Sequence, residues 1–128
     1  MFFLYNLIVV FADFVVKLLA VFSQKLKLFV DGRKSVFDTL ATKIKPNDKT
    51  IWFHAASLGE YEQGLPVMEQ MKLQFPNHKI ILTFFSPSGF EVRKNNTVTD
   101  VTVYLPLDTA TNAKKFVDLA HPDMAFFI

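Results

Sequence analysis

Between Thr50 and Ile128, short apolar runs alternate with stretches of helical periodicity, and this alternation restricts the fold more than any other feature. Four runs have the length and apolar character of buried parallel strands, namely Thr50–Ala56, Lys79–Phe85, Val101–Leu105 and Met124–Ile128. Strands separated by helices pair in parallel through right-handed crossovers. The sequence therefore predicts an α/β fold, a doubly wound parallel sheet with helices on both faces.

The three stretches between these runs have helical patterns. The first extends to Phe75 and contains Pro66, which predicts that the helix starts late or kinks there. The second is a short polar helix that follows a predicted turn at Ser86–Gly89. The third begins after Asp108 or Thr109, either of which can cap a helix.

The segment from Met1 to Val30 is much more apolar than the rest of the chain. On a helix its few polar residues fall on one narrow stripe, made of Asn6, Asp13, Lys17 and Gln24. Asp13 and Lys17 also have the spacing and order of a helical ion pair. We therefore predict one long membrane-anchor helix, spanning or lying deep in the interface. The alternative is a buried helix of a larger soluble protein.

Basic residues follow this apolar segment and none precedes it; they are Lys25, Lys27, Arg33 and Lys34. A cleaved signal peptide has the opposite order, with positive charge before its apolar run. Basic residues after an apolar helix favour the cytoplasmic face and can contact anionic head groups. We therefore expect an anchored protein whose remainder lies in the cytoplasm.

These patterns divide the chain into three parts. Residues 1–30 are expected to form the anchor helix and residues 50–128 the α/β domain. Residues 31–49 are expected to be a linker, with turns at Gly32–Lys34 and Pro46–Asp48 around a short amphipathic piece. Because the last apolar strand has no exit loop after it, we expect the domain to be truncated at its C-terminal end.

Composition and spacing exclude several kinds of site. The chain has no cysteine, which excludes disulfides, thiolate zinc sites and a cysteine nucleophile. A net charge of +2 gives no indication of a nucleic-acid partner. Gly59 and Gly64 have the first spacing of a phosphate-binding loop, but Leu65-Pro66 replaces its lysine and hydroxyl residue. The histidines are too scattered for a metal pair on one helix face, so we predict no metal site.

Ligands of such sheets bind at the carboxyl ends of the strands, where the loops Ser57–Glu60, Ser86–Gly89 and Pro106–Asp108 are expected. Glu60 stands where a catalytic base could act. The spacing Ser57-x-x-Glu60 is equally that of a capping box, in which each side chain satisfies a backbone donor. The amides and hydroxyls of Ser86–Gly89 could hold an anionic group or simply form a turn.

Motifs at these loops resemble those of the 3-deoxy-D-manno-octulosonic acid (Kdo) transferase family. Trp52–Glu60, with the sequence Trp-Phe-His-Ala-Ala-Ser-Leu-Gly-Glu, resembles the family signature. Thr83–Gly89 resembles its Thr-x-x-Thr-Pro-Thr-Gly stretch with Ser at two positions, and Tyr104–Asp108 resembles its Tyr-Leu-Pro-x-Asp segment. Gly32-Arg33-Lys34 after an apolar helix also fits. Four motifs in the family's order, over essentially the whole chain, make the resemblance specific.

The resemblance implies the Rossmann-like N-terminal half of a GT-B glycosyltransferase. Such an enzyme transfers Kdo from CMP-Kdo to the lipid A precursor in lipopolysaccharide biosynthesis, at the cytoplasmic face of the inner membrane. It implies that Glu60 is the general base and that no cofactor or metal takes part. The residues expected to bind substrate are Ser57, Gly59, Ser86, Ser88 and Gly89. The CMP-Kdo donor is expected to bind a C-terminal domain that this chain lacks.

The sequence departs from the family pattern in two places. It ends at Ile128, before the family's Glu-x-Glu-Leu-Trp-Pro segment, so we expect the chain alone to be inactive. An Arg-Phe-Gly-Glu-Arg-like stretch is not recognisable in Ser35–Lys45. Two other functions stay open: a membrane-tethered binding or scaffold domain without catalysis, and a GT-B glycosyltransferase with a different lipid acceptor.

Overall fold

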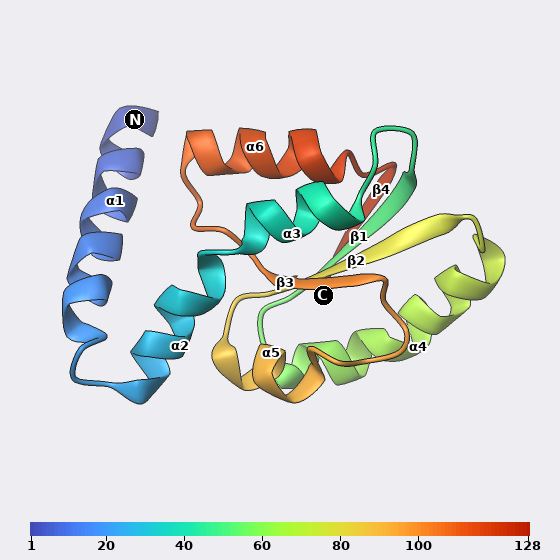
Figure 1. Ribbon diagram of the computed structural model, residues 1–128, viewed down its shortest axis with the longest axis horizontal. Coiled ribbons are helices and arrows are strands. Elements are labelled where there is room, and N and C mark those ends of the chain that lie inside the picture. Colours follow the sequence, from blue (N-terminus) through green and yellow to red (C-terminus); the bar gives the residue numbers. More distant parts are fainter.

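The computed structural model describes the chain from Met1 to Ile128, as four parallel strands and six helices (Figure 1). In chain order the elements are α1 (Phe2–Leu19), α2 (Gln24–Arg33), α3 (Val36–Lys43), β1 (Lys49–Ala55), α4 (Leu58–Gln74), β2 (His78–Phe84), α5 (Pro87–Arg93), β3 (Val101–Tyr104), α6 (Ala110–Ala120) and β4 (Met124–Phe127). The predicted parallel α/β sheet is confirmed, and each strand begins and ends within one residue of its prediction.

The strands lie in the order β3-β2-β1-β4, so the chain builds outward from β1 in both directions. In the register, Phe53 of β1 pairs with Leu82 of β2 on one side and with Phe126 of β4 on the other. The order in which the chain adds strands therefore reverses between β1 and β4, although all four strands are parallel. Doubly wound sheets bind their ligands at such a switch point.

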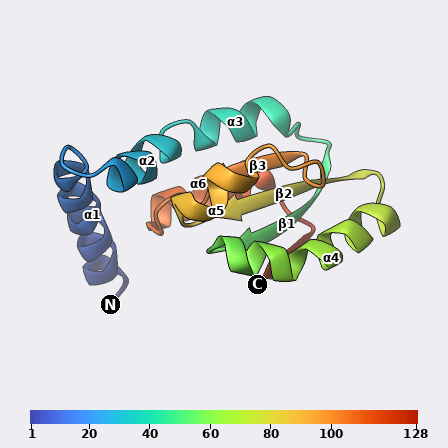
Figure 2. The same ribbon diagram turned by 90° about the horizontal axis from the view of Figure 1, so that it is seen from below.

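Helices cover both faces of the sheet. Figure 2 shows α3 and α4 on opposite sides of it. On one face, α3 and α6 pack against Ile81 of β2 and Val103 of β3. The helices contribute Val36, Leu40 and Phe116 to this core. On the other face α4 and α5 cover a second core, whose buried residues are Ile51, Phe53, Ala55, Tyr61, Met68, Ile80, Leu82 and Phe84. These two apolar layers hold the strand ends in place.

Side-chain caps begin the three helices that follow strands. Ser57, Ser86 and Thr109 occupy the N-cap positions, and each accepts a hydrogen bond from the backbone N–H three residues later. Thr109, rather than Asp108, is therefore the cap of α6. The turn predicted at Ser86–Gly89 is the first turn of α5. Pro66 lies inside α4 without delaying its start.

The N-terminal part differs from the prediction. Instead of one helix through Val30, α1 ends at Leu19 and α2 begins at Gln24. Gly32 and Arg33, predicted in a turn, are the last two residues of α2. After the turn between the two helices, α2 reaches the sheet, where Arg33 donates hydrogen bonds to the carbonyls of Phe85 and Leu105.

Residues 31–49, expected as a linker, contain part of the core. Val36, Leu40 and Ile44 are buried between α3 and the sheet. The amphipathic piece predicted there is α3, and the expected turn at Pro46-Asn47 follows it. α3 thus covers part of one face of the sheet, although it lies before the first strand and outside the alternation of strands and helices.

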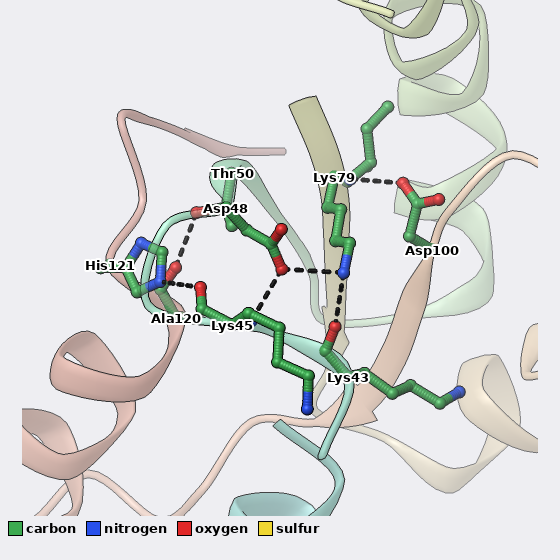
Figure 3. A network of polar contacts seen from close by, with 9 residues as sticks. Lys43, Lys45, Asp48, Thr50, Lys79, Asp100, Ala120 and His121 are labelled. Atoms are coloured by element: carbon green, nitrogen blue, oxygen red, sulfur yellow. Dashed lines mark hydrogen bonds and ion pairs between the residues drawn. The ribbon is translucent and has the colours of Figure 1, made fainter. Parts of the chain in front are cut away.

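Polar contacts tie the turn before β1 to the amino end of β2 (Figure 3). Asp48 accepts a hydrogen bond from the Lys45 N–H at 2.7 Å and lies 2.8 Å from Nζ of Lys79. Lys79 also donates to the Lys43 carbonyl at 2.8 Å. The hydrogen bond from Lys79 is the main reason that the pKa of Asp48 lies below its ordinary value. This network stabilises the amino edge of the sheet and leaves the carboxyl edge to the candidate site.

Candidate functional site

The loops that follow β1, β2 and β3 meet at the carboxyl edge of the sheet. This edge faces α1 and α2, as the course of the strands in Figure 1 shows. All three sequence-predicted loops therefore lie on one side of the molecule. The loop after β1 is the one next to the switch point, because β1 pairs with β4 there.

Ala56 connects the first two loops. Its N–H donates to Oε2 of Glu60, and its carbonyl accepts a hydrogen bond from the Ser86 N–H at 2.9 Å. One residue thus joins the Glu60 carboxylate to the start of α5. The sequence-predicted residues of these two loops lie together at the first and second strand ends.

The capping role that the sequence allowed for Glu60 is present in the structure. Oγ of Ser57 accepts from the Glu60 N–H at 3.4 Å, and the Glu60 carboxylate accepts from the N–H of Ala56, one residue before the N-cap. Glu60 is half-buried, and only Oε2 has a hydrogen-bond partner within the protein. Its second carboxylate oxygen is free to accept a hydrogen bond from a ligand, so the cap and a role as base are compatible.

Gly59 lies beside Glu60 with open space around it. A Cβ added there would meet no atom within 4 Å. At Gly89, in contrast, a Cβ would lie 2.6 Å from the Phe84 ring and 3.0 Å from the backbone nitrogen of Leu58. Close packing of α5 against Phe84 of β2 and the start of α4 therefore explains Gly89, whereas no packing contact explains Gly59. Gly59 is exposed in the first turn of α4 and directly precedes Glu60.

Ser86 and Ser88 bond to each other at the start of α5. Their hydroxyl oxygens lie 2.7 Å apart, and Oγ of Ser86 also accepts from the Gly89 N–H at 3.4 Å. Ser88 is exposed and Ser86 half-buried. The hydroxyls thus have a structural role within this turn.

His54 lies at the end of β1 and bonds to the neighbouring strand. Its Nδ1 is 2.9 Å from Oγ1 of Thr83, which also accepts from Nε1 of Trp52 at 2.9 Å. Partial burial lowers the pKa of His54, although the nearby Glu60 charge and a hydrogen bond with Thr83 act in the opposite direction. The imidazole is therefore neutral at pH 7, and the structure makes His54 a hydrogen-bonded strand residue next to the site.

Arg33 holds two of the strand ends together, a role that the sequence analysis missed. Its guanidinium donates to the carbonyls of Phe85, at 2.8 Å, and Leu105, at 2.9 Å, which follow β2 and β3. The same group lies over the Phe29 ring at 3.7 Å. Burial lowers the pKa of Arg33 to about 10, so the residue stays charged at pH 7. Arg33 is thus withdrawn from the exposed basic group in which the sequence placed it.

A sequence signal for this arrangement exists. Asp31 and Lys34 are three residues apart, the spacing of neighbours on a helix, and their side chains pair at 2.6 Å. That spacing indicates that the helix continues through Gly32 and Arg33. The sequence prediction instead placed a turn at Gly32, because glycine is common in turns.

The loop after β3 contacts α1. Oη of Tyr5 donates to Oδ2 of Asp108 at 2.6 Å, and Oδ1 of Asn6 accepts from the N–H of Ala110, the first residue of α6, at 3.0 Å. A hollow of about 440 Å³ lies between α1 and the start of α6. The third predicted loop therefore adjoins α1, away from Glu60.

The chain holds no group of three or more histidine, aspartate or glutamate side chains close enough to bind a metal ion. The carboxyl edge carries the carboxylates of Glu60 and Asp108, a neutral imidazole, hydroxyls and backbone amides. Such groups can accept a proton from a hydroxyl and hold polar ligands.

Known proteins are similar to this chain over most of its length. Residues 31–128 match the family model of 3-deoxy-D-manno-octulosonic-acid transferase (kdotransferase). The 3-deoxy-D-manno-octulosonic acid transferase of Aquifex aeolicus is 37% identical over 73 residues, which are 56% of this chain and 20% of that protein. The Haemophilus influenzae transferase is 33% identical over 81 residues, or 62% of this chain and 19% of that protein. The Chlamydia trachomatis transferase is 29% identical over 101 residues, which are 77% of this chain and 23% of that protein.

The chain spans about a fifth of the length of these curated relatives. No solved structure matches it significantly. The family match covers three quarters of the chain and includes every strand, the Ser57–Glu60 loop and the Ser86–Gly89 loop. The chain therefore belongs to the family of the 3-deoxy-D-manno-octulosonic-acid transferases.

Proposed function

We propose that the protein is the acceptor-side part of a GT-B glycosyltransferase that transfers Kdo from CMP-Kdo to the lipid A precursor in lipopolysaccharide biosynthesis. Membership of the Kdo transferase family supports the reaction type. The observation that carries the proposal is the position of Glu60. Glu60 follows the carboxyl end of β1, the strand at the switch point, and one of its carboxylate oxygens has no protein partner.

The proposed reaction needs a proton acceptor. A sugar hydroxyl of the acceptor attacks the anomeric carbon of Kdo, and the new C–O bond forms as the bond from that carbon to the CMP phosphate oxygen breaks. The bonding electrons leave with CMP, and the hydroxyl proton passes to the Glu60 carboxylate. A sugar hydroxyl is too weak an acid to react unaided near pH 7, so a positioned carboxylate accelerates the step.

The loops after β1 and β2 supply further polar groups. We assign Ser57, Gly59, Ser86, Ser88 and Gly89 to substrate binding within this proposal. Support comes from the hydrogen bond between Ala56 and Ser86, which keeps the two loops adjacent. Ser88 is exposed, so its hydroxyl can meet a ligand.

The proposal also states where the protein acts and which domain binds each substrate. The protein acts at the cytoplasmic face of the inner membrane, to which α1 attaches it; α1 is long and apolar enough to cross a membrane, judged by length and composition. CMP-Kdo binds to a separate C-terminal domain, as the much greater length of the relatives suggests. The 128-residue chain alone is therefore proposed not to transfer Kdo.

The test is an assay of Kdo transfer from CMP-Kdo to purified lipid A precursor. Two samples are compared: the 128-residue chain, and this chain supplied with a donor-binding C-terminal domain of a Kdo transferase. We expect no product from the first and transfer by the second. Turnover by the chain alone contradicts the proposal that a separate C-terminal domain binds CMP-Kdo. Transfer of another sugar, or to another lipid only, favours a different GT-B enzyme, and binding without any transfer favours the scaffold function.

A further inference from the structure

The helix α1 has two different faces along its whole length. Its half-buried residues include Asn6, Val9, Asp13 and Val16, at helical spacing, on the side that faces the sheet. The opposite side carries Leu4, Phe11 and Leu18, which are 59%, 66% and 61% exposed. No residue of α1 is fully buried. An apolar face of this size on the outside of the molecule needs a covering surface.

The domain contacts α1 near its beginning as well as near its end. Tyr5 and Asn6, close to the first turn, bond to Asp108 and to the start of α6. Near the other end, Asp13 and Lys17 border a hollow of about 330 Å³ together with Arg33 of α2. α1 therefore lies alongside the carboxyl edge of the domain and does not project from it (Figures 1 and 2).

This arrangement conflicts with a helix that crosses the bilayer. If Phe2–Leu19 crossed the hydrocarbon, the contacts of Tyr5 and Asn6 would carry Asp108 and the first residues of α6 into it. A carboxylate and non-helical backbone in contact with lipid are both costly. A helix in the plane of the interface avoids this cost, because its polar side faces protein and only its apolar side enters lipid.

The charges beside α1 suit an anionic membrane surface. Lys25 and Lys27 of α2 are exposed, and neither forms an ion pair within the chain. Lys34 is exposed as well; its side chain is 71% accessible and pairs only with Asp31. Basic side chains next to an interfacial helix strengthen its binding to anionic lipid.

We propose that α1 lies in the plane of the membrane–water interface, with its Leu4–Phe11–Leu18 face in lipid, and thereby holds the carboxyl edge of the sheet at the membrane surface. The partner is a lipid bilayer that contains anionic phospholipid. A substrate hydroxyl that cannot leave the bilayer would then meet the edge that carries Glu60. The inference rests on the membrane location in the proposed function but not on any role of Glu60 in catalysis.

Nitroxide labels at single cysteines test this orientation, because the chain contains no other cysteine. The variants are Leu4→Cys, Phe11→Cys and Leu18→Cys, with Lys49→Cys at the amino edge as the control. The labelled full chain is bound to vesicles of phosphatidylethanolamine and phosphatidylglycerol. The depth of each label follows from its relative exposure to oxygen and to a water-soluble nickel chelate.

We expect equal, shallow depths for the three α1 labels, about 5–10 Å into the boundary of head groups and acyl chains. The Lys49→Cys label should stay in water. A deep label at Phe11→Cys between two shallower ones indicates a spanning helix and overturns the proposal. Water exposure or immobilisation by protein at all three positions also overturns it, because α1 would then be covered by another protein surface or a second copy.

Charge neutralisation supplies an independent readout. Lys25→Gln and Lys27→Gln together should weaken vesicle binding roughly 30-fold, at about a fivefold loss for each lysine near the surface. The matched control is Lys43→Gln with Lys49→Gln, two lysines at the opposite edge of the sheet, for which we expect no change. Equal losses in both pairs contradict the orientation. Neither readout needs sugar transfer, so a failure of the proposed catalytic function leaves this test intact.

Discussion

Gly32 lies so close to Tyr104 that a Cβ at position 32 would overlap Cε2 and Cδ2 of the tyrosine ring. The ring cannot move aside easily, because Tyr104 is fully buried and packs against Phe90 with the ring centroids 4.2 Å apart. Its hydroxyl has no hydrogen-bond partner, and burial raises the pKa of Tyr104 to about 12. Ring packing therefore holds α2 against β3, and the next residue, Arg33, reaches the strand ends from there.

Gly32→Ala should destabilise the protein. In an exposed helix this change is stabilising, but here the methyl group overpacks the contact with Tyr104 and costs about 1–3 kcal/mol. The free energy of unfolding in urea measures the effect. An unfolding midpoint equal to that of the wild type contradicts the contact.

Gly59→Ala should preserve or raise the stability of the protein and lower its activity. No atom lies within 4 Å of the added methyl group, so the free energy of unfolding should stay unchanged or rise by up to about 1 kcal/mol. If the open space admits substrate, Kdo transfer by the chain supplied with a donor-binding C-terminal domain should fall roughly 10- to 100-fold because the acceptor is displaced. Full transfer activity in a stable variant removes Gly59 from the substrate site.

Arg33→Lys should destabilise the carboxyl edge although it keeps the charge. A single ammonium cannot reproduce the planar fork that donates to Phe85, Leu105 and Phe29. We expect a loss of about 1–2 kcal/mol in the free energy of unfolding, since the part-buried carbonyls of Leu105 and Phe29 lose donors. Arg93→Lys is the control, because Arg93 pairs with Glu62 at the surface and should lose little. Equal effects of the two substitutions speak against a special role of Arg33.

The stability difference between the wild type and Asp48→Asn should depend on pH. The folded-state pKa of Asp48 lies below its ordinary value of 3.8, mainly because of the hydrogen bond from Lys79. A lowered carboxyl pKa contributes stability that is complete above the unfolded-state value and disappears as the pH falls through the folded-state value. The variant should therefore be less stable than the wild type at pH 7 and approach it below about pH 4.

Unfolding of both proteins in urea, followed over this pH range, measures the difference. Asp38→Asn, on the exposed side of α3, serves as the control. A constant difference between wild type and Asp48→Asn at every pH rules out the ionised carboxylate as its source.

Much of the fold could be predicted because local pattern and tertiary structure agree after Thr50. The apolar runs around Phe53 and Leu82 have no polar alternation, as buried parallel strands require, and cap residues such as Ser57 and Thr109 begin the helices between them. The loops that carry Ser57–Glu60 and Ser86–Gly89 could be located for the same reason, since parallel topology brings the strand ends to one edge.

The N-terminal part could not be predicted because long-range contacts decide it. Gly32 suggests a turn from its local sequence, but its fit against Tyr104 and the hydrogen bonds of Arg33 keep it in a helix. The break between Leu19 and Gln24 has no local signal either, since no proline or glycine lies between them. Asp108 could cap α6, yet it bonds to Tyr5 more than a hundred residues away.

The sequence also could not decide between the two roles of Glu60, because one spacing serves both. Ser57 and Glu60 do form the cap, so removal of the carboxylate could change the fold and the chemistry together. Glu60→Gln separates the two roles. The amide oxygen can still accept the Ala56 N–H, whereas a neutral amide cannot take a proton from a sugar hydroxyl.

The most direct test of the central claim is the single-turnover rate of Kdo transfer by Glu60→Gln in the chain supplied with a donor-binding C-terminal domain, measured with CMP-Kdo and lipid A precursor already bound. Glu62→Gln is the matched control, since Glu62 lies on the same helix and pairs with Arg93 at the surface. We predict a rate that is roughly 10²- to 10⁴-fold lower for Glu60→Gln, unchanged for Glu62→Gln, and an unfolding midpoint near that of the wild type for both. A Glu60→Gln rate close to that of the wild type would contradict the account and leave Glu60 as a helix cap alone.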